Sequence, residues 1–452
     1  CVIGAGPSGM AVAKAFLARS IPFDWFEREP DIGGLWNIKT QTGVVYETTH
    51  LISASLYTAF EDFPMEEEEY PLYPSHASVM DYFRSYANQF GLLDKVQLSK
   101  SVEHVAPRNG NWQVRISGEG APRFYKGVVL ANGHHFVPRV PRIPGQLDGE
   151  VIHSRAYKSP KQLRDKRVLV IGGGNSGCDI VIDAVHNAEC VVHSMRRGYW
   201  FVPKFLLGFP THGTLEFLEW LRMPRWLKAR VLAATYYLLV GPPERYGLAR
   251  PDHGIHQSHP TMTDEIPRQL EHGRITLKPD VARFAGNEVV FEDGTSEEID
   301  LVVCATGYEI SFPFLDNSLV LGYNGVPLLY MNVFHPRHEG LFAAGLIQAN
   351  GSIWRLADDQ AQLIATAIVA REKAPEVADK FRDRVIAAGP DRGMQHHFVE
   401  SDRHKLEVNY YEYRRALKRL LRKFGPLAKT SLDKPDWVSS DDVESTTHVK
   451  AA

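Results

Sequence analysis

The chain has 452 residues, of which 44% are hydrophobic and 23% charged, and its formal net charge is -3. This length predicts at least two domains, and the nearly neutral charge gives no electrostatic reason to expect a nucleic-acid partner. Four scattered cysteines without a Cys-x-x-Cys pair argue against a zinc site, a disulfide scaffold and a dithiol reductase, and indicate a reducing, cytoplasmic compartment.

The opening stretch predicts a strand, a phosphate-binding turn and a helix. An apolar strand runs into Gly4-x-Gly6-x-x-Gly9, and a helical composition follows. Gly4 permits the tight turn, Gly6 lets the main chain approach a pyrophosphate, and Gly9 lets the helix pack close to the strand. A second strand at 23–26 ends in Glu27, 18 residues after Gly9, where a carboxylate can bond both ribose hydroxyls. This unit therefore predicts a dinucleotide with a plain ribose, as in FAD. Because residue 1 already lies in the strand, we expect residues before it in the natural protein, and no targeting signal can be read.

The loop after Glu27 predicts a wall for a flat ring system. The paired Gly33 and Gly34 let the main chain lie against a ring, and Trp36 can cover it. The alternative is an ordinary turn beside a core tryptophan. The next elements expected are a helix at 79–90, strands of a small antiparallel layer at 96–105 and 112–116, a buried strand at 127–131 followed by Asn132-Gly133-His134, and a stiff exit from the domain at 138–145.

A second complete glycine fingerprint follows a buried strand at 167–171, as Gly172-x-Gly174-x-x-Gly177. After the next strand, Arg196 stands 19 residues beyond Gly177, the spacing that delivers Glu27 in the first unit. A carboxylate there would repel a 2'-phosphate, whereas guanidiniums bind one through charge-assisted, fork-shaped hydrogen bonds. Arg196 and its neighbour in sequence, Arg197, therefore predict NADPH, the alternative being a solvated arginine pair.

Residues 205–254 are rich in Leu, Trp, Tyr and Pro and predict a mainly helical insertion. It fits simple subdomain packing, an apolar lid over a substrate entrance, or a shallow contact with a membrane surface. The longest apolar run, 231–240, is shorter than the roughly 20 residues of a spanning helix, so no transmembrane segment is expected. His253, His256 and His259 lack the other features of a metal site, so no metal is expected and we interpret them as structural or solvent-facing.

The remaining elements return the chain to the first domain. The expected order is strands at 190–193, 275–277, 289–291 and 301–304, insertion helices at 215–221 and 229–240, a buried segment at 341–346, a helix at 358–370, a basic helix at 410–424 and a tail at 430–452. The predicted division is 1–157 for the first part of the first domain, 158–304 for the second domain with its insertion at 205–254, 305–425 for the return part, and 426–452 for the tail.

The two fingerprints, 168 residues apart, together with Ala305-Thr306-Gly307-Tyr308, resemble the flavin-containing monooxygenases of bacterial type, among the class B flavoprotein monooxygenases. Residues 147–158 match that group's signature Phe-x-Gly-x-x-x-His-x-x-x-(Tyr/Phe)-(Lys/Pro), except that Leu147 replaces Phe. The segments 33–36 and 194–200 are also similar to family segments, and the likeness extends from residue 1 to about residue 425.

The resemblance implies an α/β fold with two Rossmann-like domains, in which a discontinuous FAD domain accepts the inserted NADPH domain. It implies FAD binding at Gly4, Gly6, Pro7, Ser8, Gly9, Glu27, Gly34, Leu35, Trp36 and Gln360. It implies NADP binding at Gly172, Gly174, Asn175, Ser176, Gly177, Ser194, Arg196, Arg197, Ala305, Thr306 and Gly307.

The implied reaction is oxygenation of a small nucleophilic molecule by O2. NADPH reduces FAD, the reduced flavin and O2 form a C4a-hydroperoxide, and one oxygen atom passes to an amine nitrogen or a sulfide sulfur, the chemistry being the cofactor's. Open alternatives are a Baeyer-Villiger enzyme acting on ketones, whose signature usually ends in Trp and Pro or Asp rather than Tyr157-Lys158, an uncoupled NADPH oxidase, and a redox sensor without turnover. A homodimer is also open.

One departure from the family pattern concerns the flavin side of the site. Members commonly carry an asparagine near the flavin, a few residues after a tyrosine that Tyr46 resembles, and counting back from 60–64 that place falls on Ile52. The nearest polar side chains are His50, Ser53 and Ser55. With Tyr157 of the signature, His50 and Ser53 are the catalytic candidates.

Overall fold

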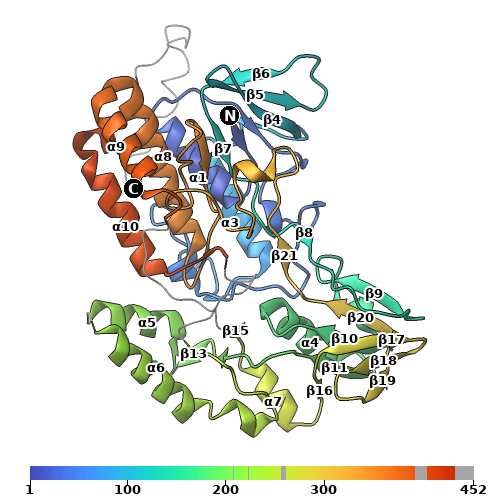
Figure 1. Ribbon diagram of the computed structural model, residues 1–452. Coiled ribbons are helices and arrows are strands. Elements are labelled where there is room, and N and C mark those ends of the chain that lie inside the picture. The colour runs from blue at the N-terminus through green and yellow to red at the C-terminus, as the bar shows by residue number, and fades with distance from the viewer. Residues whose placement is uncertain (207, 222, 256–260, 392–404, 433–452) are drawn as a thin grey trace.

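The computed structural model describes residues 1–206, 208–221, 223–255, 261–391 and 405–432 (Figure 1). Two parallel five-stranded sheets, one in each lobe, organise these residues. The fold class predicted from the two glycine fingerprints is confirmed, because each fingerprint joins the central strand of its own sheet to a helix.

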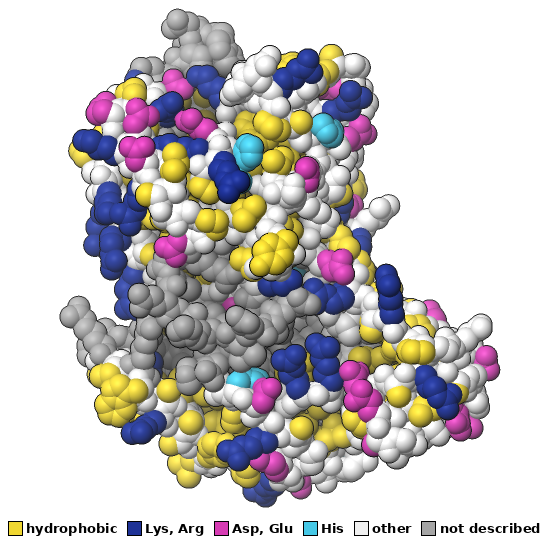
Figure 2. Space-filling view, in the orientation of Figure 1, with side chains coloured by type: hydrophobic (Ala, Val, Ile, Leu, Met, Phe, Trp, Pro, Cys, Tyr) yellow, Lys and Arg dark blue, Asp and Glu magenta, His cyan; other side chains and the backbone are white. Residues whose placement is uncertain are grey.

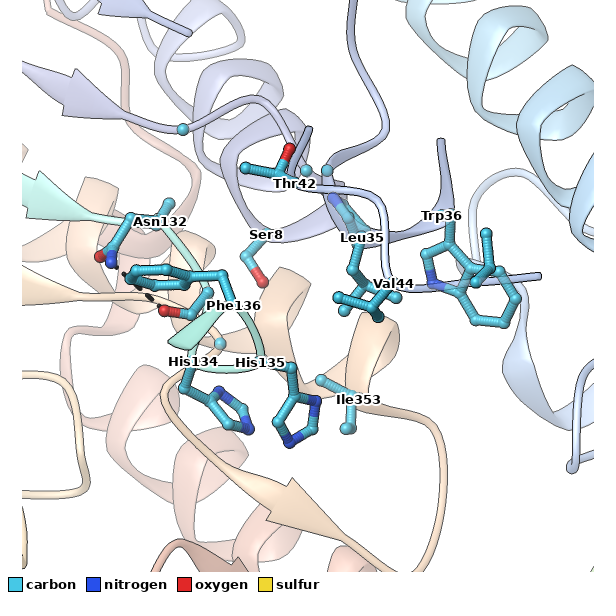
Figure 3. Close-up of a pocket in the computed structure, with 18 of the residues that line it drawn as sticks. Ser8, Leu35, Trp36, Thr42, Val44, Asn132, His134, His135, Phe136 and Ile353 are labelled. Atoms are coloured by element: carbon cyan, nitrogen blue, oxygen red, sulfur yellow. Dashed lines mark hydrogen bonds between the residues drawn. The ribbon is translucent and has the colours of Figure 1, made fainter. Parts of the chain in front are cut away.

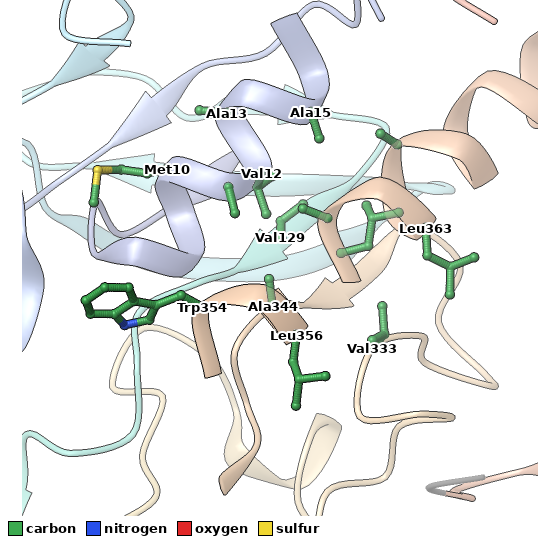
Figure 4. Close-up of a cluster of buried hydrophobic side chains, with 14 of the residues drawn as sticks. Met10, Val12, Ala13, Ala15, Val129, Val333, Ala344, Trp354, Leu356 and Leu363 are labelled. Carbon is green, nitrogen blue, oxygen red and sulfur yellow. The ribbon is translucent and has the colours of Figure 1, made fainter. Parts of the chain in front are cut away.

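The first sheet has the strand order β22-β7-β1-β2-β3, and its pairs are parallel. Its strands are nearly all apolar, as expected where helices cover a parallel sheet. Figure 4 shows side chains of α1 meeting those of α8 and the sheet in one buried cluster that includes Met10, Val129 and Leu363. The elements are β1 (Val2–Ile3), α1 (Pro7–Leu17), β2 (Trp25–Phe26), β3 (Val96–Gln97), β7 (Val128–Leu130), β22 (Leu341–Ala343) and α8 (Ile353–Lys373).

The second sheet repeats this arrangement with the order β16-β11-β10-β20-β9. Its edge strand β9 lies within the segment 1–157 expected for the first domain, so the chain enters the second sheet before residue 157. The elements are β9 (Glu150–His153), β10 (Arg167–Ile171), α4 (Asn175–Asn187), β11 (Cys190–Ser194), α7 (Glu265–Glu271), β16 (Thr276–Lys278), and β20 (Leu301–Cys304), with an antiparallel layer of β17 (Val281–Ala285), β18 (Glu288–Phe291) and β19 (Ser296–Glu298).

The two glycine fingerprints share one close backbone approach. A Cβ atom added to Gly9 would lie 1.9 Å from the carbonyl oxygen of Gly4, and one added to Gly177 would lie 2.0 Å from that of Gly172. No side chain fits at either position, as expected where the third glycine of this turn packs a helix against a strand.

The chain crosses twice between the lobes, and the two crossings pair with each other. β8 (Val137–Pro138) and β21 (Tyr308–Glu309) form an antiparallel ribbon between the sheets (Figure 1). Beside it, the His153 ring shares a 2.9 Å hydrogen bond between Nε2 and the Gly307 carbonyl, while Nδ1 accepts from the Arg155 main-chain N–H. Burial lowers the pKa of His153, and the pairing requires the neutral ring with its proton on Nε2. This histidine of the linker signature therefore ties the two crossings of the chain together.

The insertion is mainly helical, as predicted, with α5 (Thr211–Trp220) and α6 (Arg225–Leu239). An apolar cluster of Trp200, Val202, Tyr236 and Met262 joins it to the second domain. Short strands around it are β12 (Phe201–Val202), β13 (Phe205–Leu206), β14 (Phe209–Pro210) and β15 (Thr261–Met262).

The C-terminal helices cover the first domain beside α8 (Figure 1). The predicted basic helix is α10 (Tyr410–Lys423), and its other face buries Tyr413, Leu417 and Leu420. The expected tail spans residues 430–452. Its first three residues lie against the first domain, where the Leu432 N–H donates to the Arg19 carbonyl. The rest of the tail lies outside the described residues. The other elements are α2 (Ser55–Thr58), α3 (His76–Gln89), α9 (Pro375–Ala388), β4 (Val102–Arg108), β5 (Asn111–Ile116), β6 (Arg123–Tyr125), β23 (Gln348–Ala349) and β24 (Glu407–Val408).

The surface in Figure 2 mixes Lys and Arg with Asp and Glu over both lobes. This mixture of both signs on the face shown agrees with the net charge of -3.

Candidate active site

A cavity of about 490 Å³ opens at the carboxyl ends of the first sheet (Figure 3). This volume falls within the range of roughly 300–1,000 Å³ typical of ligand sites, and the edge is where parallel sheets bind ligands. Three helices, α1, α4 and α8, also begin at this cavity, so the N–H groups of their first turns favour negative charge there. Its lining includes Gly4, Gly6, Pro7 and Ser8 from the first fingerprint, Glu27, the loop residues Gly34, Leu35, Trp36, Val44, Tyr46, His50, Ile52 and Ser53, the segment 131–136, residues 351–354 at the start of α8, and Asn175, Ser176 and Asp179 of α4.

The paired glycines place their loop against the first fingerprint. Gly33 and Gly34 have φ of 104° and 54°, values that favour glycine. The Gly33 N–H donates to the Ala5 carbonyl at 3.0 Å, and Trp36 of the same loop lies edge-on to Trp354, with 6.1 Å between ring centroids. The predicted aromatic wall is therefore at the cavity rather than in a distant core.

Glu27 ends β2 at the cavity and is 6% exposed. Its Oε2 accepts the Ala5 N–H at 2.5 Å, and its Oε1 accepts the Glu29 N–H at 2.9 Å. Burial raises the pKa of the carboxyl, and the two main-chain donors act in the opposite direction. Each oxygen keeps a second lone pair, so Glu27 can hold the turn and still accept ribose hydroxyls.

Gln360 does not line the cavity, contrary to its expected contact with FAD. It is fully buried in α8, accepts the Gly345 N–H at 2.8 Å and donates to the Tyr413 hydroxyl at 2.7 Å. Gly345 approaches Ser8 so closely that an added Cβ would lie 2.0 Å from the serine Oγ. Gln360 therefore supports the loop that touches the first fingerprint.

The α4 helix is bonded to the first domain by two aspartates. The Tyr46 hydroxyl donates to Asp179 Oδ2 at 3.0 Å, and the Tyr157 hydroxyl donates to Asp183 Oδ2 at 2.8 Å. Thr48 donates to the same Asp183 oxygen at 2.6 Å. Tyr157 is 0% exposed and does not line the cavity. The structure therefore places Tyr157 in the domain junction, and its catalytic role stays a prediction.

The other signature residues close the wall of the cavity. The Arg155 guanidinium donates to the carbonyls of Phe136 and Gln41, and Lys158 Nζ donates to those of Gly43 and Val45 at 2.8 and 3.2 Å. The linker between the domains thus holds both the loop around 41–45 and the segment that ends at Phe136.

Asp179 gives the domain junction a pH dependence. Burial raises the pKa of its carboxyl from 3.8 to about 6. Tyr46, Lys204 and His50 oppose this shift, and Asp183 adds to it. Because the folded pKa lies above the unfolded value, this contribution to stability is full below about pH 4 and is lost as the pH rises through about 6.

Asp179→Asn removes this titration while keeping an acceptor for Tyr46. At about 1.4 kcal/mol per pKa unit, we expect the wild-type free energy of unfolding to fall by about 3 kcal/mol relative to the variant between about pH 4 and pH 8. Urea unfolding of both proteins across this range measures the difference. Parallel stability curves would contradict the assignment.

The other two catalytic candidates lie at the cavity wall. His50 Nδ1 lies 2.9 Å from the Thr48 carbonyl, and Ser53 Oγ lies 2.7 Å from Thr58 Oγ1. Between them, Ile52 packs against the apolar cluster of Trp200. At the position where the family pattern predicts an asparagine, the Ile52 side chain therefore supports the insertion. The polar side chains of His50 and Ser53 lie on either side of it in the sequence.

The second fingerprint meets the arginine pair at the carboxyl edge of its sheet. An added Cβ at Gly173 would touch Met195 and Tyr199, so the segment carrying Arg196 and Arg197 lies beside the turn. Arg196 is exposed, Arg197 is half-buried, and neither forms a hydrogen bond or ion pair within the described part of the chain.

The remaining predicted NADP residues at this edge make internal contacts. Asn175 Oδ1 accepts the Met262 N–H at 2.9 Å, and Thr306 donates to the Arg139 carbonyl. Ser194 is 1% exposed and donates to the Pro279 carbonyl at 2.6 Å. The Ser194 hydroxyl therefore already has a main-chain partner. Of Asn175, Ser194 and Thr306, only Asn175 lines the large cavity.

Sequence reasoning gave no role to several cavity residues. His134, His135 and Phe136 follow β7, the strand beside β1, and Asp179 lies one turn into α4. The signal was the place of 132–134 directly after a buried strand, where the carboxyl end of a parallel strand meets the ligand edge.

Two predicted absences concern metals and membranes. Among the described residues no group of His, Cys, Asp and Glu could hold a metal ion, and no helix is long and apolar enough to cross a membrane. His253 pairs with Asp252 at 2.7 Å, whereas His256 and His259 lie outside the described residues.

Comparison with protein families matches residues 1–436 to the model described as "Flavin-binding monooxygenase-like". The "Flavin-containing monooxygenase 5" of Oryctolagus cuniculus is 33% identical over 436 residues, which cover 91% of this chain and 80% of that protein. The "Dimethylaniline monooxygenase [N-oxide-forming] 2" of Pan troglodytes is 32% identical, with the same coverage of 91% and 80%.

Solved structures show the same fold at lower identity. S-allyl-L-cysteine S-oxygenase from Allium sativum matches with a TM-score of 0.63 and 21% identity, covering 92% of this chain and 87% of that one. Cyclohexanone monooxygenase in its caprolactone-bound form matches with a TM-score of 0.65 and 16% identity, covering 93% and 96%. The protein is a flavin-dependent monooxygenase that uses FAD, NADPH and O2. The two fingerprints, the cavity between them and the match over almost the whole length place this chain in the flavin-binding monooxygenase-like family.

Proposed function

We propose that this chain transfers one oxygen atom from O2 to an amine nitrogen or a sulfide sulfur of a small molecule, with FAD in the large cavity and NADPH on the second fingerprint. The observation that carries the proposal is that one cavity contains both the first fingerprint and the start of α4, the helix of the second fingerprint. Two dinucleotides held on these elements meet in one space.

The cavity residues fit FAD. The turn of Gly4 and Gly6 offers main-chain N–H groups at a helix N-terminus to a pyrophosphate, Glu27 offers acceptors to a ribose, and Trp36 offers an apolar face to a ring system. Bound FAD supplies the redox chemistry that activates O2. The chain contributes positioning and apolar lining, since Ile52 and Trp36 both line the cavity and Ile52 packs against the cluster that holds the insertion.

The residues at the second turn fit the 2'-phosphate of NADPH. Arg196 and Arg197 form no hydrogen bond or ion pair with the described part of the chain, and the segment that carries them lies beside that turn. The bonds from Tyr46 and Tyr157 to α4 hold this turn in register with the large cavity.

The nucleophile class rests on the relatives. The Pan troglodytes relative is named for N-oxide formation at 32% identity, whereas the ketone-oxidising neighbour shares 16% and supports the fold alone. Exposed Phe209, Trp226 and Leu238 of the insertion, at 69, 61 and 84%, favour an apolar entrance or a shallow contact with a membrane surface. The homodimer and the cytoplasmic location stay predictions.

The test compares products at equal substrate concentration. The purified protein, loaded with FAD and supplied with NADPH in air, is given thioanisole, N,N-dimethylaniline or cyclohexanone. We expect sulfoxide or N-oxide formation to exceed lactone formation, with NADPH consumption measured alongside. Lactone as the main product would assign the protein to ketone oxidation. Release of H2O2 without product from any of the three would leave an NADPH oxidase, and no NADPH consumption would leave a sensor.

A further inference from the structure

The His134 side chain is a buried polar group without a partner in the wall of the cavity. It is 9% exposed, and neither Nδ1 nor Nε2 has a hydrogen-bond partner. Several other described side chains also have buried polar atoms without a partner, but His134 alone among them lines the cavity. Figure 3 shows its ring beside that of His135, with the ring centroids 4.2 Å apart.

Buried polar atoms in native proteins nearly always have partners, and the exceptions call for an explanation such as a ligand. Burial, and then the neighbouring His135, lowers the pKa of His134 well below its usual value. The ring is therefore neutral and offers one N–H donor and one acceptor nitrogen. His135 also packs against Tyr308, at 5.5 Å between centroids, so the pair is held in place from the interdomain ribbon.

We propose that His134 is a binding residue for FAD that hydrogen-bonds an uncharged polar group of the cofactor, a hydroxyl of its ribityl chain or a carbonyl or nitrogen of its ring system. This inference rests on the proposed function, which places FAD in the cavity. The first fingerprint and Glu27 on the same cavity supply the contacts for the pyrophosphate and the ribose. A neutral imidazole gains little from a phosphate compared with a charged donor, so its partner is the uncharged part.

The test is His134→Phe in the full chain, studied with and without FAD. Phenylalanine keeps the ring volume and removes both polar atoms, so the flavin-free protein should unfold at the same or a higher temperature than wild type. FAD affinity, measured by quenching of flavin fluorescence, should fall roughly three- to tenfold, the loss of one or two neutral hydrogen bonds. The rise in unfolding temperature on adding FAD should shrink accordingly. His134→Gln keeps a donor and an acceptor and should recover most of the affinity.

His335→Phe is the matched control. His335 is 3% exposed and does not line the cavity, and its Nδ1 accepts the main-chain N–H groups of Arg337 and His338 at 3.0 and 2.9 Å. This variant should lower the unfolding temperature of the flavin-free protein and leave FAD affinity unchanged.

The outcomes separate the inference from the function. Wild type that fails to bind FAD would overturn both. Wild-type FAD affinity in His134→Phe, with or without a loss of stability, would overturn only the inference. Weaker binding of NADP+ with unchanged FAD binding would also overturn it, by moving His134 to the second dinucleotide.

Discussion

Gly9→Ala should yield protein that has lost FAD but still binds NADP+, and Gly177→Ala should yield protein that keeps FAD and has lost NADP+. At both positions the new Cβ would lie about 2 Å from a carbonyl oxygen of the same turn, so the helix must move away from its strand. Overpacking of this kind costs about 1–3 kcal/mol or more. This movement of the helix displaces the main-chain N–H groups that face the pyrophosphate. We therefore expect a hundredfold or larger loss of affinity at the altered site, equivalent to roughly 2.7 kcal/mol.

The flavin content of the purified protein, from its visible absorbance, and NADP+ titration measure this pair of effects. Gly120→Ala is the control, because Gly120 has open space around it and no positive φ, and it should change neither cofactor. Far-UV circular dichroism checks that both variants stay folded. Loss of NADP+ from the Gly9 variant with FAD retained would reverse the assignment of the two fingerprints.

Arg196→Ala combined with Arg197→Ala should remove the preference for NADPH over NADH. The segment that carries both arginines lies beside the second turn, and neither side chain forms a hydrogen bond or ion pair with the described part of the chain. Charge-assisted hydrogen bonds contribute roughly 1.5–3 kcal/mol each, so KM for NADPH should rise about tenfold for each arginine removed. KM for NADH should change little, because that cofactor has no 2'-phosphate.

Steady-state NADPH and NADH oxidation at several salt concentrations measures this preference. The wild-type preference should weaken at high salt, since an exposed ion pair is screened, whereas the double variant should show little salt dependence. Arg283→Ala, an exposed arginine of β17, serves as the control for a general change of surface charge. A double variant that still prefers NADPH would place the phosphate at other residues.

The sequence alone predicted the two dinucleotide units and their order, which the structure confirms, and it predicted FAD at the first unit and NADPH at the second. Short local patterns carry that information, because a glycine turn, a strand before it and the side chain that ends the next strand are fixed by a few consecutive residues. The same holds for the insertion helices and for β10, β11 and β20, whose apolar runs or periodicity are strong.

Only the tertiary structure decided what the residues of the linker signature and of α8 do. Tyr157 and Gln360 were expected at the active site, yet their hydrogen bonds reach Asp183, 26 residues away, and Tyr413, 53 residues away. The residues of β9 alone could not assign it to the second sheet, because the strand that it pairs with, β20, follows about 150 residues later in the chain. His134 became a ligand candidate only when the fold buried it at the cavity without a partner. Pairings across such separations depend on the packing of the two lobes, and no local pattern encodes them.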